Sequence, residues 1–185
     1  MGKLYEAYVH SFILDKDKDR DFFSHILDLY ETEEFQSMGI YPQHGNINRI
    51  QHILSVTYVA YTIAQRRKKA DVHQTLRGSI LHDLFYYDWH VPGDGSHRLH
   101  GYRHPGFALK NAIALYPAIT EIEKNIIKRH MWPLTPTPPK YLEGFIVSMS
   151  DKYCATQEVL LSRIEQYNKK FQRDVALAAE EQRHA

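Results

Sequence analysis

The chain has 185 residues, with 23 lysines and arginines against 22 aspartates and glutamates, and 43% of its residues are hydrophobic. That length accommodates one domain with a substantial core, and the apolar content excludes a disordered chain. The net charge of +1 lacks the basic excess of dedicated nucleic-acid binders, so we expect no nucleic-acid partner. The longest uncharged run, residues 50–65, is too short and too polar to span a membrane, and we expect no membrane partner.

The N-terminal segment and the cysteine content predict a cytoplasmic protein. Glu6 and His10 interrupt the only apolar stretch near the N-terminus, so no signal peptide is expected there. The single cysteine, Cys154, excludes an internal disulfide and suits a reducing compartment. The 12 histidines are the unusual feature of the composition, because histidine is the commonest metal ligand and the acid–base group near neutral pH. Their positions therefore guide the functional prediction, whereas the sequence predicts no particular oligomeric state.

Apolar residues recur at helical spacing along nearly the whole chain, and no segment alternates as a pair of strands would. The pattern predicts an all-α, single-domain bundle of about eight helices. In the first half these are two helices within residues 4–30, one from about residue 48 to 68, and one from 71 to 86. The charged run 15–20 separates the first two, and Asn46 or Asn48 is expected to cap the third.

In the second half a glycine-rich loop, residues 88–103, precedes the remaining helices. Pro105 fits the first turn of the helix that follows this loop. Thr120 and Glu123 form a capping box that opens the next helix. After a proline-rich connector, helical periodicity returns over residues 141–167 and gives way to a charged C-terminal segment.

Six histidines and aspartates are expected to project inward from apolar stripes of these helices: His52, His82, Asp83, His104, His130 and Asp151. A histidine or carboxylate buried without a partner is costly, and any one of them alone is more often a hydrogen-bonded core residue. Six from five helical segments favour a shared metal site, because helical bundles build such sites from histidine and carboxylate side chains. Four imidazoles and two carboxylates without a thiolate suit one or two divalent ions of Fe, Mn, Zn, Co or Ni.

Three motifs give the chain a resemblance to the HD-domain superfamily of metal-dependent phosphohydrolases: Arg49-x-x-His52, Leu81-His82-Asp83 and Ser150-Asp151-Lys152. Within the superfamily it resembles a group of small bacterial members without an assigned substrate, through the segments Gln43-His-Gly-Asn46, Leu99-His-Gly-Tyr-Arg-His-Pro105 and Arg129-His-Met-Trp-Pro133. The resemblance implies an N-terminal helical extension over 1–45, an HD domain over 46–168, and a charged tail or helix over 169–185. It also implies a dinuclear metal site. The first ion would be held by His52, His82, Asp83 and Asp151, and the second by Asp83, His104 and His130.

The activity implied by this resemblance is that of a hydrolase: cleavage of a phosphate ester or anhydride of a nucleotide or small metabolite by a metal-activated water. The residues assigned to catalysis are Asp83, His100, Arg103 and Lys152. His90 and His97 are further candidates for the general acid, and Arg98 and Arg129 for phosphate binding, although such cations are more often solvated surface charges. Tyr86 stands where members with dinucleotide tetraphosphatase activity usually carry lysine, which disfavours that substrate.

Two other functions fit the same residues. Some HD-type proteins with this ligand set are di-iron oxygenases, and a third possibility is a non-catalytic ligand-binding module with a structural metal ion. Phe85, Tyr86, Tyr87 and Trp89 follow the His-Asp pair and are expected either to stack on a nucleobase or to pack in the core. His44 is expected beside the first ligand helix or simply in a loop, and Cys154 is expected to be a small core residue.

Overall fold

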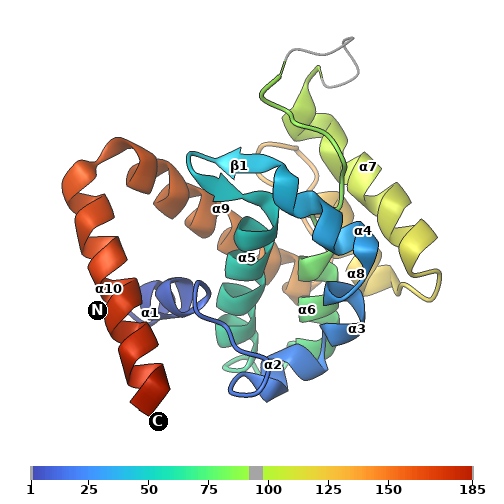
Figure 1. The fold of residues 1–185 in the computed structure, drawn as a ribbon. Helices are drawn as coiled ribbons and strands as arrows, with labels where there is room; N and C mark the ends of the chain where they lie inside the picture. The colour runs from blue at the N-terminus through green and yellow to red at the C-terminus, as the bar shows by residue number, and fades with distance from the viewer. Residues whose placement is uncertain (1, 92–97, 185) are drawn as a thin grey trace.

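Helix α5 (Arg49–Ala64) runs through the centre of the fold, and the other helices are arranged around it (Figure 1). The structure, a computed structural model, describes residues 2–91 and 98–184. The Asn48 side chain accepts a hydrogen bond from the Gln51 backbone N–H at 2.9 Å and so caps the start of α5. Beyond Arg49 the helix carries no charged residue and is apolar on several faces. It therefore packs against α1, α6 and α9 at once.

The predicted all-α fold class is confirmed. The α-helices of the described residues are α1 (Lys3–His10), α2 (Arg20–Ser24), α3 (Leu27–Tyr30), α4 (Glu33–Gln36), α5, α6 (Val72–Ile80), α7 (His100–Leu115), α8 (Glu121–Arg129), α9 (Leu142–Arg163) and α10 (Glu165–His184). A short 3₁₀-helix, η1 (Ser37–Ile40), leads to a two-stranded hairpin. None of the helices in the described part of the chain is long and apolar enough to cross a membrane.

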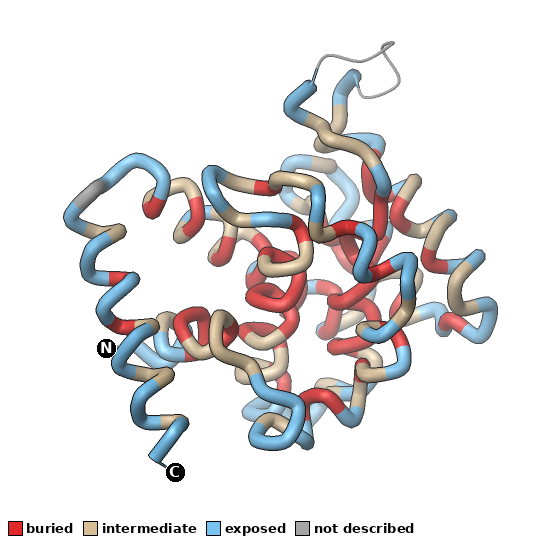
Figure 2. Tube along the Cα trace, in the orientation of Figure 1, coloured by how far each residue is buried: buried red, intermediate tan, exposed pale blue. Residues whose placement is uncertain are grey.

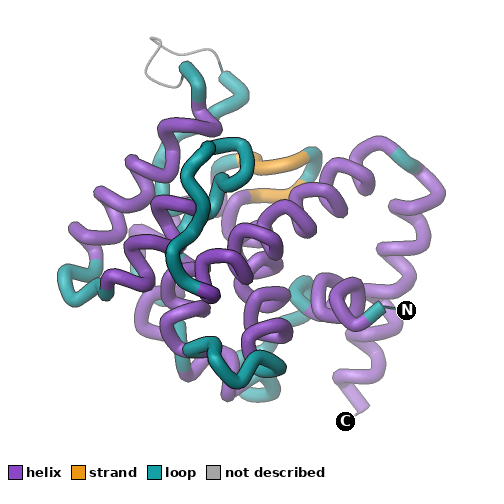
Figure 3. The backbone as a smooth tube through the Cα atoms, turned by 180° about the vertical axis from the view of Figure 1, so that it is seen from behind, coloured by secondary structure: helices purple, strands orange, loops and turns teal. Residues whose placement is uncertain are grey.

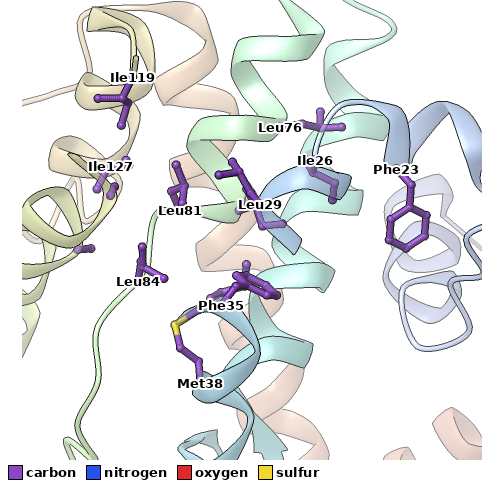
Figure 4. Packing of buried hydrophobic residues seen from close by; sticks show 14 of the residues in the cluster. Phe23, Ile26, Leu29, Phe35, Met38, Leu76, Leu81, Leu84, Ile119 and Ile127 are labelled. Atoms are coloured by element: carbon purple, nitrogen blue, oxygen red, sulfur yellow. The ribbon is translucent and has the colours of Figure 1, made fainter. Parts of the chain in front are cut away.

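The N-terminal segment contains more and shorter helices than the two predicted within residues 4–30. The charged run forms a turn, in which an Asp15 carboxylate oxygen accepts backbone N–H groups of Asp17 and Lys18. Helices α2 to α4 then follow as single turns that are too short to be stable alone and are held by burial of their apolar side chains. Figure 4 shows Phe23, Leu29 and Phe35 of these turns within the hydrophobic cluster that they share with α6.

Two hydrophobic clusters both include residues of α5. The first contains Ile53 of α5 together with apolar residues of α2 to α4, α6 and α7. The second contains Val56 and Val59 of α5, with residues of α1, α9 and α10. Figure 2 shows the buried segments gathered around α5, α6 and α9, whereas α10 is exposed along most of its length. Seen from behind in Figure 3, α10 stands at one side of the molecule, where it packs on α1 and α9.

Helices α6 and α8 approach one another closely at Gly78. A Cβ at this position would lie 2.5 Å from Ile126 Cδ1 and 2.9 Å from Ile126 Cβ, so only glycine fits without a shift of the neighbouring helix. The start of α8 has the capping box that the sequence predicts, with Thr120 and Glu123 bonded reciprocally to each other's backbone N–H. The two helices therefore run side by side with a spacing set by the backbone of α6.

Three departures from the predicted helix boundaries shape the site. Helix α6 ends at Ile80 rather than near 86, because residues 81–85 form tight turns in which Phe85 N–H bonds to the Asp83 carbonyl. Helix α7 begins at His100, earlier than predicted, so that Pro105 lies inside it. The loop before α5 forms a hairpin of β1 (Pro42–His44) and β2 (Ile47–Asn48), too short for an alternating pattern to reveal. Its turn needs Gly45, whose φ is +58°.

Candidate metal centre

The six predicted ligands come together in one buried cluster. His52 belongs to α5, His104 to α7 and Asp151 to α9, while His82 and Asp83 follow the end of α6 and His130 caps the C-terminus of α8. Each of the six is less than a tenth exposed. Segments that are far apart in sequence thus deliver four imidazoles and two carboxylates to one place in the core.

Asp83 lies between two groups of histidines. Its Oδ1 is 3.1 Å from His104 Nε2 and 3.5 Å from His130 Nε2. Its Oδ2 is 3.7 Å from His82 Nε2 and 3.9 Å from His52 Nε2. Two ligands of one ion at bond lengths of about 2.1 Å lie roughly 3.4 Å apart in tetrahedral geometry, so these separations are those of a metal site. Among the described residues, two groups of potential ligands therefore share Asp83: His52 and His82 in one, His104 and His130 in the other.

Asp151 completes the side of the cluster that contains His52. Its Oδ1 is 3.3 Å from His52 Nε2, and its Oδ2 accepts a hydrogen bond from Lys152 Nζ at 2.9 Å. The same ammonium group donates to the His130 carbonyl at 2.5 Å. Lys152 thus joins α9 to the end of α8 and places one positive charge beside the cluster.

Each of the four imidazole rings is held in its orientation by a hydrogen bond at Nδ1. The acceptors are the Glu158 carboxylate for His52, the Ser79 carbonyl for His82, the His100 carbonyl for His104 and the Ile127 carbonyl for His130. Carboxylates and carbonyls only accept hydrogen bonds, so each Nδ1 carries the proton and a neutral ring has its lone pair at Nε2. The four Nε2 atoms face Asp83, so the lone pair of each neutral ring points toward the centre of the cluster.

This arrangement leaves buried polar atoms without hydrogen bonds. His52 Nε2, His82 Nε2 and Asp83 Oδ1 have no hydrogen-bond partner among the described residues. His104 Nε2 and His130 Nε2 lie 2.8 Å apart, where two neutral rings that donate from Nδ1 would oppose their lone pairs. Each unpaired buried group costs about 1–3 kcal/mol, and a cation at the centre would pair with all of them. The cluster can therefore hold a metal ion.

The charge states of the cluster also suit a cation. Burial would raise the pKa of Asp83, but the surrounding His82, His104 and His130 hold it well below the usual value. Burial lowers the pKa of His82, and burial together with His104 and His82 lowers the pKa of His130 well below its ordinary value. Metal ligands must be ionised carboxylates and neutral imidazoles, which are the forms that these shifts favour. His52 differs: burial would lower its pKa, but the carboxylates of Glu158 and Asp151 raise it well above the usual value.

A buried arginine supports Asp83 from behind. Gln43, on the hairpin, donates to Asp83 Oδ2 at 2.9 Å, and Arg49 Nε donates to Gln43 Oε1 at 3.1 Å. The Arg49 guanidinium is fully buried, bonds to the Phe85 and Tyr87 carbonyls at 2.6 and 2.9 Å, and lies 3.6 Å over the Phe85 ring. Burial lowers the pKa of Arg49 to about 10. This chain of contacts fixes the orientation of the carboxylate that both groups of histidines share.

The residues predicted for catalysis do not all reach the cluster. The His100 ring stacks 4.4 Å from the His104 ring, and its Nδ1 is 3.0 Å from the Tyr87 hydroxyl. Lys152 contacts the cluster as described above. Arg103 instead is exposed, with its guanidinium 5.6 Å from the Phe107 ring, so the structure does not bring it among the ligands.

The remaining candidates lie around the edge of the site or outside it. Arg98 is exposed, and Arg129 lies with lysines of α8 on a face that does not bear the buried residues. His90 bonds to Asp88 and stacks on Trp89 at the surface, and His97 lies outside the described residues.

Of the four aromatic residues after the His-Asp pair, Phe85, Tyr87 and Trp89 pack against other rings, whereas Tyr86 is 39% exposed. Phe85 is fully buried, and Trp89 stacks with His100 at a centroid distance of 5.2 Å. These contacts favour the core interpretation over a platform for a nucleobase. Cys154 is buried in the second hydrophobic cluster, and burial raises the pKa of its thiol well above the usual value. Both features are therefore parts of the packing.

Sequence reasoning missed the residues behind the ligands. Glu158 follows Asp151 by seven residues, so helical periodicity places the two on one face of α9, and this spacing is a signal that could have identified it. Gln43 and Arg49 belong to the motifs quoted above, but nothing in their sequence spacing from Asp83 predicts that they support its carboxylate. Their role depends on the hairpin, which brings β1 over the cluster.

No family model matches the chain, and no curated protein or solved structure matches it. The resemblance to the HD-domain superfamily therefore stays a prediction from the motifs.

Proposed function

We propose that this chain is a metal-dependent phosphohydrolase of the HD type, which cleaves a phosphate ester or anhydride of a nucleotide or small metabolite. One observation carries the proposal: four imidazole Nε2 atoms converge on the Asp83 carboxylate in a buried site, and His52 Nε2, His82 Nε2 and Asp83 Oδ1 have no hydrogen-bond partner among the described residues. A donor set of this kind, two groups of potential ligands that share Asp83, would suit a pair of divalent transition-metal ions. The motifs that resemble HD-domain hydrolases supply the reaction class.

The residues around the centre have definite tasks in this proposal. Ions bound here would act as Lewis acids toward water and phosphoryl oxygens. Lys152 donates to ligand residues on both α8 and α9, so its positive charge is held where an incoming phosphate would approach the centre. His100 lies against the ring of His104 and is the proposed proton donor to the leaving oxygen. Gln43 and Arg49 keep the Asp83 carboxylate in a fixed orientation.

The decisive experiment joins metal content to turnover. The full chain, purified without chelators, should contain up to two transition-metal ions and should release phosphate from a panel of phosphomonoesters and nucleotides. We expect His82→Ala to lose both metal and activity, and His184→Ala, a matched change at an exposed histidine of α10, to keep both.

Two results would contradict the proposal and point to the alternatives. Metal retained without hydrolysis of any phosphorylated compound would favour a binding module with a structural ion. An iron-loaded protein whose optical spectrum changes with oxygen, and which oxygenates a substrate, would favour the di-iron oxygenase.

A further inference from the structure

Glu158 is a buried carboxylate that the ligand set does not include. It lies on α9 and is 1% exposed, and its two oxygens are 2.9 and 3.0 Å from His52 Nδ1. His52 is its ion-pair partner, and no lysine or arginine of the described chain forms a salt bridge with it. A buried carboxylate without a full cationic partner is costly, so the negative charge must be balanced through the imidazole. The cation that balances it best would be an ion on the far nitrogen of that ring.

This pairing makes His52 unlike the other three imidazoles. Theirs are bonded at Nδ1 to peptide carbonyls, which are neutral, whereas His52 is bonded to a full negative charge. A carboxylate behind an imidazole fixes the ring and raises the basicity of its metal-binding nitrogen. His52 is therefore the strongest imidazole donor of the cluster.

The two halves of the centre also differ in their own charge. The half with His52 and His82 has two carboxylates beside it, Asp83 and Asp151. The half with His104 and His130 has Asp83 alone. Lys152 donates to Asp151 and to the His130 carbonyl, so its positive charge lies beside both halves. The second carboxylate attracts a divalent cation more strongly to the first half, and Glu158 adds a third negative charge behind it.

We propose that Glu158 is a positioning residue that makes the half formed by His52, His82, Asp83 and Asp151 bind its ion first and more tightly. The other half, formed by Asp83, His104 and His130, then holds a weaker, exchangeable ion. This inference rests on the proposed metal-dependent function and assigns an order to its two ions.

Glu143 provides a matched control on the same helix. It is also a buried glutamate of α9, 5% exposed, but its carboxylate accepts the backbone N–H of Asp71 at 2.9 Å and so ties α9 to the start of α6. Its role is structural, and it faces no ligand of the cluster. A general effect of removing a buried carboxylate from α9 would appear in both variants, whereas an effect on ion binding should appear only at Glu158.

A different role for Glu158 has a separate signature. His44, His52 and Glu158 offer ligand atoms within 4.8 Å of one another, and the His44 and His52 rings lie 5.4 Å apart. If Glu158 were itself a ligand there, the chain would bind a third ion. That ion would depend on His44, whereas a positioning role does not.

The experiment is a titration of the metal-free full chain with Co²⁺, followed by calorimetry and by the visible absorption of the bound ion. We expect two resolved steps for the natural sequence and for Glu143→Gln. In Glu158→Gln the first step should weaken by about 10–100-fold, so that the two steps merge. Glu158→Asp keeps the charge but withdraws it from Nδ1, and we expect a smaller weakening of the same step; this variant also serves if Glu158→Gln does not fold.

Each remaining outcome has a definite meaning. Two unchanged steps in the Glu158 variants would overturn the positioning role while leaving the metal centre intact. A third equivalent that disappears in both Glu158→Gln and His44→Ala would overturn it in favour of direct ligation. No binding of Co²⁺ to the natural sequence would instead defeat the proposed function itself.

Discussion

The same pair of helices carries two buried polar centres that are built in opposite ways. Arg77 of α6 donates to both Asp28 oxygens at 2.8 and 3.1 Å, lies 3.6 Å from Glu123 of α8, and covers the Tyr116 ring at 4.4 Å. We call these four residues the Arg77 centre. Further along the same two helices lies the candidate metal centre, to which α6 delivers His82 and α8 delivers His130, with ring centroids 5.0 Å apart.

The difference between the centres lies in how their charges are balanced. In the Arg77 centre a guanidinium meets carboxylates of the same chain, so the protein supplies both signs. In the candidate metal centre, His52 Nε2, His82 Nε2 and Asp83 Oδ1 have no hydrogen-bond partner among the described residues, and a cation from outside the chain would pair with them. Removing one partner of a buried ion pair destabilises the fold, whereas an open cluster gains stability when it binds a ligand. The comparison indicates that function is to be sought where potential ligand atoms of several side chains converge without an ion-pair partner of opposite charge.

The largest expected effect comes from Asp83→Asn, which neutralises the carboxylate shared by both halves of the metal centre. We expect the metal content to fall below one ion per chain, with a loss of affinity of about 100-fold or more. Elemental analysis of the dialysed protein measures the number of ions per chain. Glu123→Gln, the matching change in the Arg77 centre, should leave the metal content as it is, and full occupancy in Asp83→Asn would contradict the assignment of Asp83.

Removal of the ions from the candidate metal centre should lower the thermal stability of the chain. An ion present at about 1,000 times its Kd stabilises the folded chain by about 4 kcal/mol. For a chain of this length its loss should lower the midpoint of thermal unfolding by roughly 8–16 °C. Calorimetry with and without a chelator checks this, and circular dichroism should show that the helices persist, because neither hydrophobic cluster contains a ligand. A metal-containing protein with the same unfolding midpoint in the presence and absence of the chelator would contradict the expectation.

Arg77→Met should lower the stability of the fold without changing the metal content. The change leaves Glu123, which is 2% exposed, without its cation, and we expect the free energy of unfolding to fall by about 3 kcal/mol. Urea unfolding measures the loss, and the metal content should stay unchanged. If this variant lost its ions as well, the two centres could not be treated as independent.

The smallest effect concerns pH. Burial would raise the pKa of Asp28, but the hydrogen bonds and charge of Arg77 lower it below the usual value. A carboxylate with a lowered pKa stabilises the fold above its unfolded pKa of about 3.9, and the gain disappears as the pH falls through the folded value. Asp28 is largely exposed, so the gain is under about 1 kcal/mol. The difference in unfolding free energy between the natural chain and Asp28→Asn should therefore shrink below about pH 4, and a difference that grows there would contradict the assigned pair.

Helical periodicity was sufficient to predict the fold class, the capping box at Thr120 and the inward projection of the six candidate ligands. It could not predict that α6 stops at Ile80, because tight turns after it depend on contacts made by the His-Asp pair. The short helices α2 to α4 are held by burial of residues such as Phe35 rather than by their own propensity.

Charged side chains were the least predictable part of the site. Arg49 and Glu158 are residue types that normally face water, and their burial depends on partners that lie far away in the sequence. Periodicity shows which face of a helix is apolar. It does not show that a charged side chain on that face forms a hydrogen bond with a carbonyl or an imidazole from another element. The candidate ligands were therefore predictable, whereas Gln43 and Arg49 were not, and Glu158 had only its helical spacing from Asp151 as a signal.

The contact between Gly78 and Ile126 has a consequence for which ions the centre accepts. Because the Ile126 side chain of α8 packs directly on the backbone of α6 at Gly78, this contact contributes to how far His82 stands from His130. Every other amino acid would add a Cβ and push the two helices apart, widening the space that their imidazoles enclose. The size of ion that the proposed centre would accept thus depends on a residue outside the candidate ligand set, and a screen for altered metal preference could begin at this glycine.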